Sequence, residues 1–312
     1  MKKFICSENE VRLDKFLVEK LKGLSRSKIQ HLIEDKQIEV NKQIVNKKHH
    51  WLNSGDKIQI LLIPSSLIVK RKASCFKKDI KIIKKNKDYV VIEKPSGLIV
   101  HGTKEIKEDS LADFLIKKYP QIKGVGDEPE FRPGIVHRLD KKVSGLMVIA
   151  LNQNSFKDLK AQFKDRNIVK KYLALVHDQM EDNDGKIDFP IERSKRSGKM
   201  VAKPKHLDEK EALTLWEIKE KFSHYTLLDV QIKTGRNHQI RAHMQSIHHP
   251  VVGDDLYNIK GYKDKFNLKR VFLHAYHLEF TDLSGERKIF EIELPEVLQN
   301  VIEEVRGKNQ EI

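Results

Sequence analysis

A run of basic residues in the first third of the chain limits how this sequence can fold. Between positions 70 and 87 there are nine lysines and arginines and a single acidic residue, Asp79. A segment with such a dense like charge cannot enter a hydrophobic core, because its charges would lose their hydration. We therefore expect this segment to connect two separately folded parts, for which 312 residues suffice. A connector of this composition can also contact phosphates.

The basic excess extends beyond this segment. The chain has 60 lysines and arginines against 45 acidic residues, a net charge of +15. Residues 1–75 hold 16 basic and 8 acidic residues, so +8 of this charge lies in about a quarter of the chain. Such an excess favours a polyanionic partner, above all a nucleic acid. A charge that serves only solubility is the alternative.

The sequence has no evident membrane or secretion signal. A membrane span needs about 18 uncharged apolar residues, and the longest candidate, 58–68, is shorter and contains Pro64. Residues 1–8 become acidic before the apolar core of a signal peptide can form. The two cysteines, Cys6 and Cys75, match no metal-binding or redox spacing, which favours a reducing compartment. We expect a cytoplasmic protein that contacts no membrane.

The segment before the basic run has the pattern of two short helices followed by short strands. Apolar residues recur at three- and four-residue steps over 11–21, Gly23 ends this helix, and Ser25 is placed to cap a second helix over 26–35. Residues 38–42 and 57–61 alternate as strands do. Five basic residues are placed where they could contact an RNA backbone: Arg12, Lys15, Arg26, Lys28 and Lys42.

Residues 10–72 resemble the S4 domain, a small RNA-binding module of ribosomal and RNA-modifying proteins. The resemblance rests on three stretches, Arg12–Leu17, Ser25–Lys28 and Ile38–Asn41. It implies an RNA-binding S4 domain over 10–72, followed by a basic linker over 73–88. A helical hairpin with surface lysines is the alternative that the residue pattern leaves open.

The longer part of the chain, 89–308, alternates strands with a few helices. We predict strands over 89–93, 146–151, 212–218 and 225–232, and a helix over 155–163. Most connections between the strands are short enough for hairpins. The expected fold class is therefore α+β: a small helix-rich domain, then a domain with a mainly antiparallel mixed β-sheet flanked by helices and loops.

Several common catalytic sites are absent from the sequence. It contains neither a phosphate-binding GxxxxGK[ST] loop nor the serine-elbow pattern. His238, His243 and His248 are spaced by five residues, so on a helix they cannot share a face as a metal-binding pair does. The pair Asp254 and Asp255 lacks the further carboxylates that a metal-dependent nuclease needs. We expect no metal and no cofactor.

One carboxylate stands out. Residues 134–140 read as an apolar strand that ends at Asp140, and Lys141, Lys142 and a Ser-Gly pair follow at once. A carboxylate at a strand end beside cations stays ionised and faces outward. On the local sequence alone, an aspartate that caps a helix or forms a turn is the commoner reading.

Residues 134–145 resemble the central motif of the RluA family of pseudouridine synthases, His-Arg-Leu-Asp followed by a Ser-Gly turn. Further stretches resemble family motifs in the same order: 93–98, 162–163, 171–176, 234–243, 250–257 and 273–275. The resemblance covers nearly the whole chain, the S4 segment included. It implies an enzyme that isomerises uridine to pseudouridine in structured RNA without a metal or cofactor.

The resemblance also implies roles for individual residues. Asp140 matches the essential nucleophile, Tyr172 the tyrosine that stacks on the base and can take part in proton transfer, and Arg241 the arginine that pairs with the aspartate. Arg138 matches the residue that helps to extrude the uridine, and His137 supports that loop or is purely structural. Lys142 and Val143 replace residues that are polar in many members, which leaves the hydrogen bonds behind the site open.

The chemistry of the reaction agrees with these roles. The N1–C1′ bond must break, the base must rotate, and C5 must bond to C1′, which a carboxylate can assist by adding to the sugar or base. The uridine must first leave its stack, which rewards an inserted side chain. An S4-bearing member of this family implies large-subunit ribosomal RNA as the substrate, with transfer RNA as the alternative. The oligomeric state is undetermined, and a monomer suffices for this chemistry.

Two alternatives from other functional classes remain. A non-catalytic RNA-binding or ribosome-assembly protein would retain the fold without the reaction. A metal-dependent RNA hydrolase would cut the strand and need a divalent ion.

Overall fold

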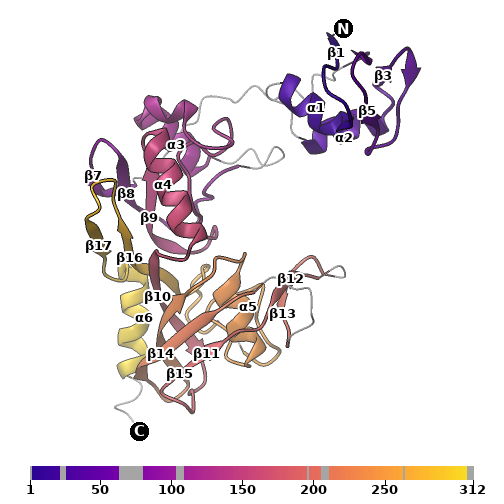
Figure 1. Ribbon diagram of the computed structural model, residues 1–312. Helices are drawn as coiled ribbons and strands as arrows, with labels where there is room; N and C mark the ends of the chain where they lie inside the picture. The colour runs from indigo at the N-terminus through magenta and orange to yellow at the C-terminus, as the bar shows by residue number, and fades with distance from the viewer. Residues whose placement is uncertain are drawn as a thin grey trace. The chain divides into compact units, whose positions relative to one another are not determined.

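The computed structural model describes residues 2–21, 26–62, 80–102, 109–194, 197–204, 211–262 and 264–307; within these ranges the side chains of residues 2 and 26–28 are not described. The chain forms two compact units, residues 1–73 and 74–312, and each is described by itself (Figure 1). Among the described residues, no helix has the length and apolar character needed to cross a membrane.

The first unit packs two helices against a small antiparallel sheet. The helices are α1 (Leu13–Lys20) and α2 (Arg26–Glu34). The sheet has the order β1 (Lys2–Ile5), β6 (Lys57–Ile60), β3 (Ile38–Val40), β4 (Gln43–Ile44). A separate pair joins β2 (Val11–Arg12) to β5 (Trp51–Leu52). Apolar residues from both helices and the sheet form one buried core, including Phe16, Leu32 and Ile58.

This unit differs from the sequence prediction at the start of its first helix. Val11 and Arg12 pair with Leu52 and Trp51, so α1 begins only at Leu13. Pairing with a partner distant in the sequence cannot be read from helical periodicity. Gly23 and Ser25, predicted to end and to start the helices, lie outside the described residues, as do the side chains of Arg26 and Lys28.

The second unit is built on a nine-stranded mixed sheet, which confirms the predicted α+β class. Its order is β11-β14-β15-β10-β16-β9-β8-β7, and β17 also pairs with β16. Every pairing is antiparallel except that of β9 with β16. The bounds are β7 (Lys81–Lys85), β8 (Tyr89–Lys94), β9 (Ser144–Ala150), β10 (Val169–His177), β11 (Asp184–Ile187), β14 (Thr214–Lys221), β15 (Tyr225–Ile232), β16 (Leu273–Thr281) and β17 (Arg287–Glu291).

Helices lie on this sheet and at its ends. In Figure 1, α3 (Leu111–Lys118) and α4 (Gln153–Lys164) lie by β8 and β9, and α6 (Glu296–Gly307) lies beside β10. A 3-10 turn, Pro120–Gly124, follows α3. The helix α5 (Gln239–Ser246) lies by β14 and a two-stranded ribbon of β12 (Ile191–Arg193) and β13 (Met200–Ala202).

The central strand β10 separates two layers of the core. Leu173 and Leu175 point to the cluster that includes the buried face of α6. Tyr172 and Ala174 point to the other face of the sheet, where the larger core cluster lies. Alternate residues of a strand face opposite sides. One face of the sheet is therefore covered by α6. Residues of β10 on the same face as Tyr172 are available to line a pocket on the other side.

Two predictions need correction, the linker over 73–88 and the strand over 134–140. The segment 73–88 is not a linker throughout, because Lys81–Lys85 form β7 at the edge of the sheet. Its isoleucines pack against the core while its lysines stay in water, which an edge strand allows. Residues 134–140 are not a strand either: Ile135 makes a single bridge to Ile149, and residues 136–140 follow as an irregular segment.

Candidate active site

The only parallel pairing in the described sheet places Asp140 beside the middle strands. Gly145 of β9 pairs with Ala275 of β16, and Ala275 in turn pairs with Tyr172 of β10. The strands approach closely here, since a Cβ on Gly145 would lie 2.3 Å from the Ala275 carbonyl oxygen. Gly145 also has a φ of +130°, which favours glycine. Asp140 lies four residues before the start of β9. It therefore reaches the pocket face of the sheet, next to Tyr172.

The turn after Asp140 is fixed by the segment that follows β8. The buried ammonium of Lys94 donates to the carbonyl of Leu98 at 2.8 Å and lies 3.5 Å from that of Lys141. Gly97 N–H donates to the same Lys141 carbonyl at 2.6 Å, and Ser96 Oγ donates to the carbonyl of Lys142 at 2.9 Å. The Lys-Pro-Ser-Gly stretch thus supports the loop that carries Asp140.

Lys142 and Val143, which depart from the family pattern, have partners of their own. Lys142 Nζ forms an ion pair with Asp255 Oδ2 at 2.8 Å. Val143 is buried, and its N–H donates to the carbonyl of Asp140 at 3.1 Å. The turn is therefore closed by a backbone hydrogen bond and a surface ion pair.

Arg241 joins two aspartates in the wall of the pocket. Its Nη1 donates to Asp140 Oδ2 at 3.1 Å, while Nε and Nη2 donate to the two carboxylate oxygens of Asp254 at 2.6 and 2.8 Å. The side chain of Asp254 is fully buried and that of Asp140 is 17% exposed. Although burial works against its charge, the hydrogen bonds to Asp254 and the charges of both aspartates raise the pKa of Arg241.

Asp254 is itself held by the backbone. Its Oδ1 accepts hydrogen bonds from the N–H groups of Leu256 and Tyr257, both at 3.0 Å. Gly253 makes this turn possible: its φ is +73°, and a Cβ there would lie 2.1 Å from the Arg270 carbonyl oxygen. The guanidinium of Arg241 also lies over the ring of Tyr257, 4.9 Å from its centre. The bidentate contact therefore fixes the plane of the guanidinium and points Nη1 at Asp140.

His238, just before α5, is a further group beside Asp140. Its Nε2 lies 3.9 Å from Asp140 Oδ2, and its Nδ1 lies 2.9 Å from the Tyr257 hydroxyl. That hydroxyl accepts the N–H of Met200 at 3.1 Å. The Tyr257 hydroxyl therefore ties His238 to Met200, and the hydrogen bond at Nδ1 turns Nε2 toward Asp140. Burial lowers the pKa of His238, although the charge of Asp140 opposes this.

Gln239 holds the loop that leads into α5. Its Oε1 accepts from Thr234 Oγ1 at 2.8 Å and from Arg236 N–H at 2.9 Å. Its Nε2 donates to Thr214 Oγ1 and to the carbonyl of Leu213, both at 3.0 Å. Both ends of this buried amide are hydrogen-bonded, so the loop and α5 are held against β14. Because Arg241 belongs to α5, its backbone is held in place as well.

Tyr172 is buried in the wall of the same pocket, with 6% of its surface exposed. Burial, and next the charge of Asp140, raises the pKa of Tyr172 well above its ordinary value. The phenol therefore keeps its proton across the physiological range.

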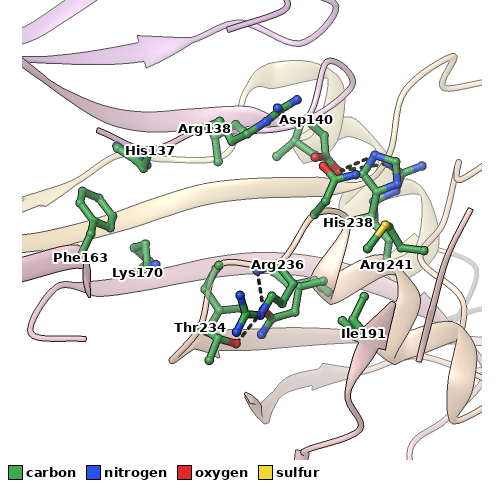
Figure 2. Close-up of a pocket in the computed structure, with 18 of the residues that line it drawn as sticks. His137, Arg138, Asp140, Phe163, Lys170, Ile191, Thr234, Arg236, His238 and Arg241 are labelled. Atoms are coloured by element: carbon green, nitrogen blue, oxygen red, sulfur yellow. Dashed lines mark hydrogen bonds and ion pairs between the residues drawn. The ribbon is translucent and has the colours of Figure 1, made fainter. Parts of the chain in front are cut away.

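The pocket itself has a volume of about 1200 Å³ and a basic lining. Figure 2 shows Asp140, His238 and Arg241 gathered on one side, with His137, Phe163 and Lys170 on the other. Further cations that line it are Arg132, Arg138, Lys164, Arg166, Arg193, Lys233 and Arg236. A cavity of this size and charge suits a nucleotide with its phosphates.

The other two predicted residues of this unit also line the pocket. Arg138 is exposed, and no described residue forms an ion pair or hydrogen bond with its side chain. His137 stacks on Phe163 with ring centres 4.7 Å apart, and its Nε2 accepts the N–H of Val148 at 3.0 Å. Burial lowers the pKa of His137 to about 3, so the ring is neutral.

The sequence analysis missed Asp254, His238 and Tyr257 as parts of this site. It considered Asp254 only as a metal ligand, and excluded it, whereas the structure pairs it with Arg241. The family motifs that contain these residues, 234–243 and 250–257, were the available signal. Among the described residues, no three His, Cys, Asp or Glu side chains are grouped as a metal ion would require.

Comparisons with known proteins agree with this geometry. Residues 88–246 match the family described as RNA pseudouridylate synthase, and residues 11–58 match the S4 domain. The chain belongs to the RNA pseudouridylate synthase family. A relative in Aquifex aeolicus, described as an uncharacterized RNA pseudouridine synthase, is 37% identical over 306 residues, which cover 96% of this chain and 95% of that protein.

Further relatives give the same result. The ribosomal large subunit pseudouridine synthase D of Nitrosomonas europaea is 33% identical over 95% of this chain and 85% of its own length. The structure of human RNA pseudouridylate synthase domain containing 4 has 25% identity and a TM-score of 0.59 over 72% of this chain and 93% of that one. As a member of the RNA pseudouridylate synthase family, this chain is an enzyme that isomerises uridine in RNA.

The first unit of this synthase displays some of the basic residues predicted to bind RNA. Lys15 is exposed on α1, and Lys42 is exposed in the two-residue turn between β3 and β4. Asn41 and Lys42 both have positive φ, as this hairpin turn requires. Arg12 is held by Asp14, with Nε to Oδ1 at 3.0 Å and Nη2 to Oδ2 at 2.9 Å.

Proposed function

We propose that Asp140 is the nucleophile of a pseudouridine synthase that acts on large-subunit ribosomal RNA. The observation that carries the proposal is the contact of the Asp140 carboxylate with Arg241 at the inner wall of a basic pocket. A carboxylate so placed offers an electron pair to the sugar or base of a uridine in the pocket. The other neighbours of Asp140 are His238, whose pKa is lowered, and Tyr172, whose pKa is raised, so both are neutral. The charge of Arg241 is therefore directed at Asp140 and not at either of them.

The reaction balances without any other reactant. The N1–C1′ bond breaks while Asp140 stabilises or bonds to the separated fragment, the base rotates, and C5 bonds to C1′. The proton on C5 then leaves to water, N1 takes up a proton, the ring regains its conjugation, and Asp140 is released. No atoms are gained or lost between uridine and pseudouridine except for the exchange of this proton with water.

Arg241 and Asp254 act together on the nucleophile. Arg241 contacts Asp140 directly and balances its charge, and Asp254 positions Arg241 through the bidentate contact. With Asp254 in place, only Nη1 faces the reacting carboxylate, and the guanidinium cannot turn away to form an ion pair elsewhere.

Tyr172 acts in the pocket as a neutral phenol. Its buried ring lies on the face of β10 that lines the cavity. It offers a flat surface on which the rotating base can stack. Because its pKa is raised, Tyr172 does not act as a phenolate that removes the C5 proton. Any proton transfer it makes is as a donor.

Arg138 and the S4 unit handle the RNA. The guanidinium of Arg138 at the pocket is exposed and pairs with none of the described residues, so it can fill the space that a flipped uridine leaves in its stack. Arg12, Lys15, Arg26, Lys28 and Lys42 contact the RNA backbone from the S4 unit, and the segment between the units contacts phosphates. We place this activity in the cytoplasm, where ribosomal RNA is assembled in bacteria such as those of the relatives.

The choice of RNA rests on relatives described as acting on the large ribosomal subunit. The test uses RNA labelled with tritium at uridine C5, with EDTA present, as protein-free large-subunit ribosomal RNA and, separately, as bulk transfer RNA. We expect tritium release from the ribosomal RNA and intact strands. Release from transfer RNA alone would contradict the substrate, and strand cutting that EDTA abolishes would contradict the reaction.

A further inference from the structure

Lys170, a cation in the wall of the pocket, has no carboxylate partner among the described residues. Lys170 precedes Tyr172 by two residues on β10, so both side chains lie on the pocket face of the strand. The ammonium nitrogen of Lys170 lies 5.2 Å from the centre of the Phe163 ring. No carboxylate in the described part of the chain lies within ion-pair distance of it.

Most neighbouring cations differ from Lys170 in their partners or their exposure. Lys171, next in the chain, faces the opposite side of β10, does not line the pocket, and lies 3.8 Å from Asp229 Oδ2. At the pocket, Arg132 pairs with Glu128 at 3.3 Å and Arg166 with Glu211 at 3.0 Å. Arg138, Lys164 and Arg193 also have no carboxylate partner among the described residues, but they are exposed and water solvates their charge. Arg236 donates to the carbonyl of Glu211 at 2.9 Å. Lys233 is half-buried and also has no carboxylate partner among the described residues, but none of their aromatic rings lies against its ammonium as Phe163 does against that of Lys170. Lys170 is half-buried.

A half-buried ammonium loses part of its hydration, and without a carboxylate nearby this loss is not compensated by an ion pair. Burial lowers the pKa of Lys170 to about 8, so it is still largely protonated at neutral pH. The face of Phe163 supplies part of the missing attraction, since an aromatic ring is negative above its plane. A phosphodiester would supply the rest, and its negative charge would favour the protonated amine.

The position of Lys170 is also well fixed. Phe163 stacks on His137, whose ring accepts the N–H of Val148 in the middle of β9. Val148, His137, Phe163 and Lys170 therefore form a continuous series of contacts from the sheet to the ammonium. This series gives His137 a supporting role behind the cation, which is the structural alternative left open by the sequence.

We propose that Lys170, supported by Phe163 and His137, binds a phosphodiester group of the RNA strand that carries the target uridine. A flipped nucleotide stays attached to the strand on both sides, so its phosphates must lie within or at the mouth of the cavity that takes its base. Asp140 and Lys170 lie on different sides of that cavity in Figure 2, as contact with the sugar and with a neighbouring phosphate requires. The inference rests on the proposed function, because only an RNA substrate brings phosphates into this pocket.

The test compares Lys170→Gln with Lys171→Gln, two adjacent changes that remove the same charge on opposite faces of one strand. Binding of the full chain to large-subunit ribosomal RNA transcribed in vitro is measured over a series of KCl concentrations. We expect Lys170→Gln to reduce the slope of log affinity against log salt by about 0.7 to 0.9, the effect of one lost phosphate contact. Lys171→Gln should leave the slope unchanged, and Lys170→Arg should restore it.

Turnover gives a second readout. Lys170→Gln should raise KM about tenfold with kcat within about threefold of the wild type, because the phosphate contact exists before and during the reaction. Thermal melting shows that the variants are folded. An equal slope for the two glutamine variants, or a loss confined to kcat, would overturn the inference. Failure of the proposed function appears separately, as tritium release that survives Asp140→Asn, and the salt slope does not depend on turnover.

Discussion

Both units of this synthase hold an arginine with a buried aspartate, yet they direct the two arginines differently. In the S4 unit, Asp14 has no exposed side-chain surface and binds Arg12 through Nε and Nη2. In the catalytic unit, Asp254 is equally buried and binds Arg241 through the same two nitrogens. The remaining nitrogen, Nη1, donates to Asp140 in Arg241, whereas no described residue accepts from it in Arg12.

The difference shows how one contact serves two purposes. A bidentate aspartate fixes the plane of a guanidinium and leaves one edge for another partner. The Arg12 side chain is 20% exposed, as suits a contact with an RNA phosphate. In Arg241 the exposure is 6%, and the edge is used inside the protein to hold a reactive carboxylate.

The largest expected effect follows from removal of the buried aspartate in the catalytic unit. Asp254→Asn leaves Arg241 with a half-satisfied buried charge, so we expect a loss of about 3 to 5 kcal/mol in unfolding free energy. Activity should fall more than 100-fold, because Arg241 loses its orientation. Chemical denaturation and tritium release measure the two quantities.

Asp255→Asn is the matched control for this change. Asp255 is the next residue, its side chain is 71% exposed, and it pairs with Lys142 at the surface. Its replacement should cost less than about 1 kcal/mol. Similar losses of unfolding free energy and activity in the two variants would contradict the claim that Asp254 orients Arg241.

Replacement of each arginine by lysine separates geometry from charge. Arg241→Lys keeps the charge but loses the bidentate contact and the edge that faces Asp140, and we expect kcat to fall about 100-fold. Arg12→Lys should change RNA affinity by less than about threefold, since a phosphate accepts a lysine as well. Single-turnover rates and filter binding measure these effects. A large loss of affinity in Arg12→Lys would mean that Arg12 reads a planar group and not a phosphate alone.

The smallest effect concerns pH. Because burial and the charge of Asp140 raise the pKa of Tyr172, its phenol is protonated at all pH values below that raised pKa. A raised pKa means that the neutral form persists as the pH increases, so kcat should show no tyrosine ionisation between about pH 7 and 10. Tyr172→Phe should have the same profile in this range. A descending limb that disappears in Tyr172→Phe would show that the phenol ionises in the complex.

The sequence predicted the parts of this molecule that local patterns and motifs determine. The helix over 155–163 and the strands over 212–218 and 225–232 lie within or overlap α4, β14 and β15, because their apolar spacing reports burial directly. The family resemblance brought Asp140 and Arg241 together, 101 residues apart in the chain, and the structure places them 3.1 Å apart.

Other features depend on contacts that local patterns do not contain. Residues 81–85 look like a charged linker, and only the exposed edge of the sheet makes them a strand. The role of Asp254 depends on the turn at Gly253 and on Arg241 of α5, so the local residue pattern does not identify its partner, and only the family motifs carry that signal. Lys170 looks like one of many lysines, and its isolation follows from the pocket that surrounds it.

The central claim is that Asp140 performs the chemistry, and it is tested most directly with Asp140→Asn on RNA labelled with tritium at uridine C5. The change keeps the size of the side chain and removes the charge that attacks. We predict that the variant binds the RNA within about threefold of the wild type and releases less than a hundredth of the tritium in a single turnover. Release near the wild-type rate with unchanged binding would contradict the account, because the nucleophile would then lie elsewhere in the pocket.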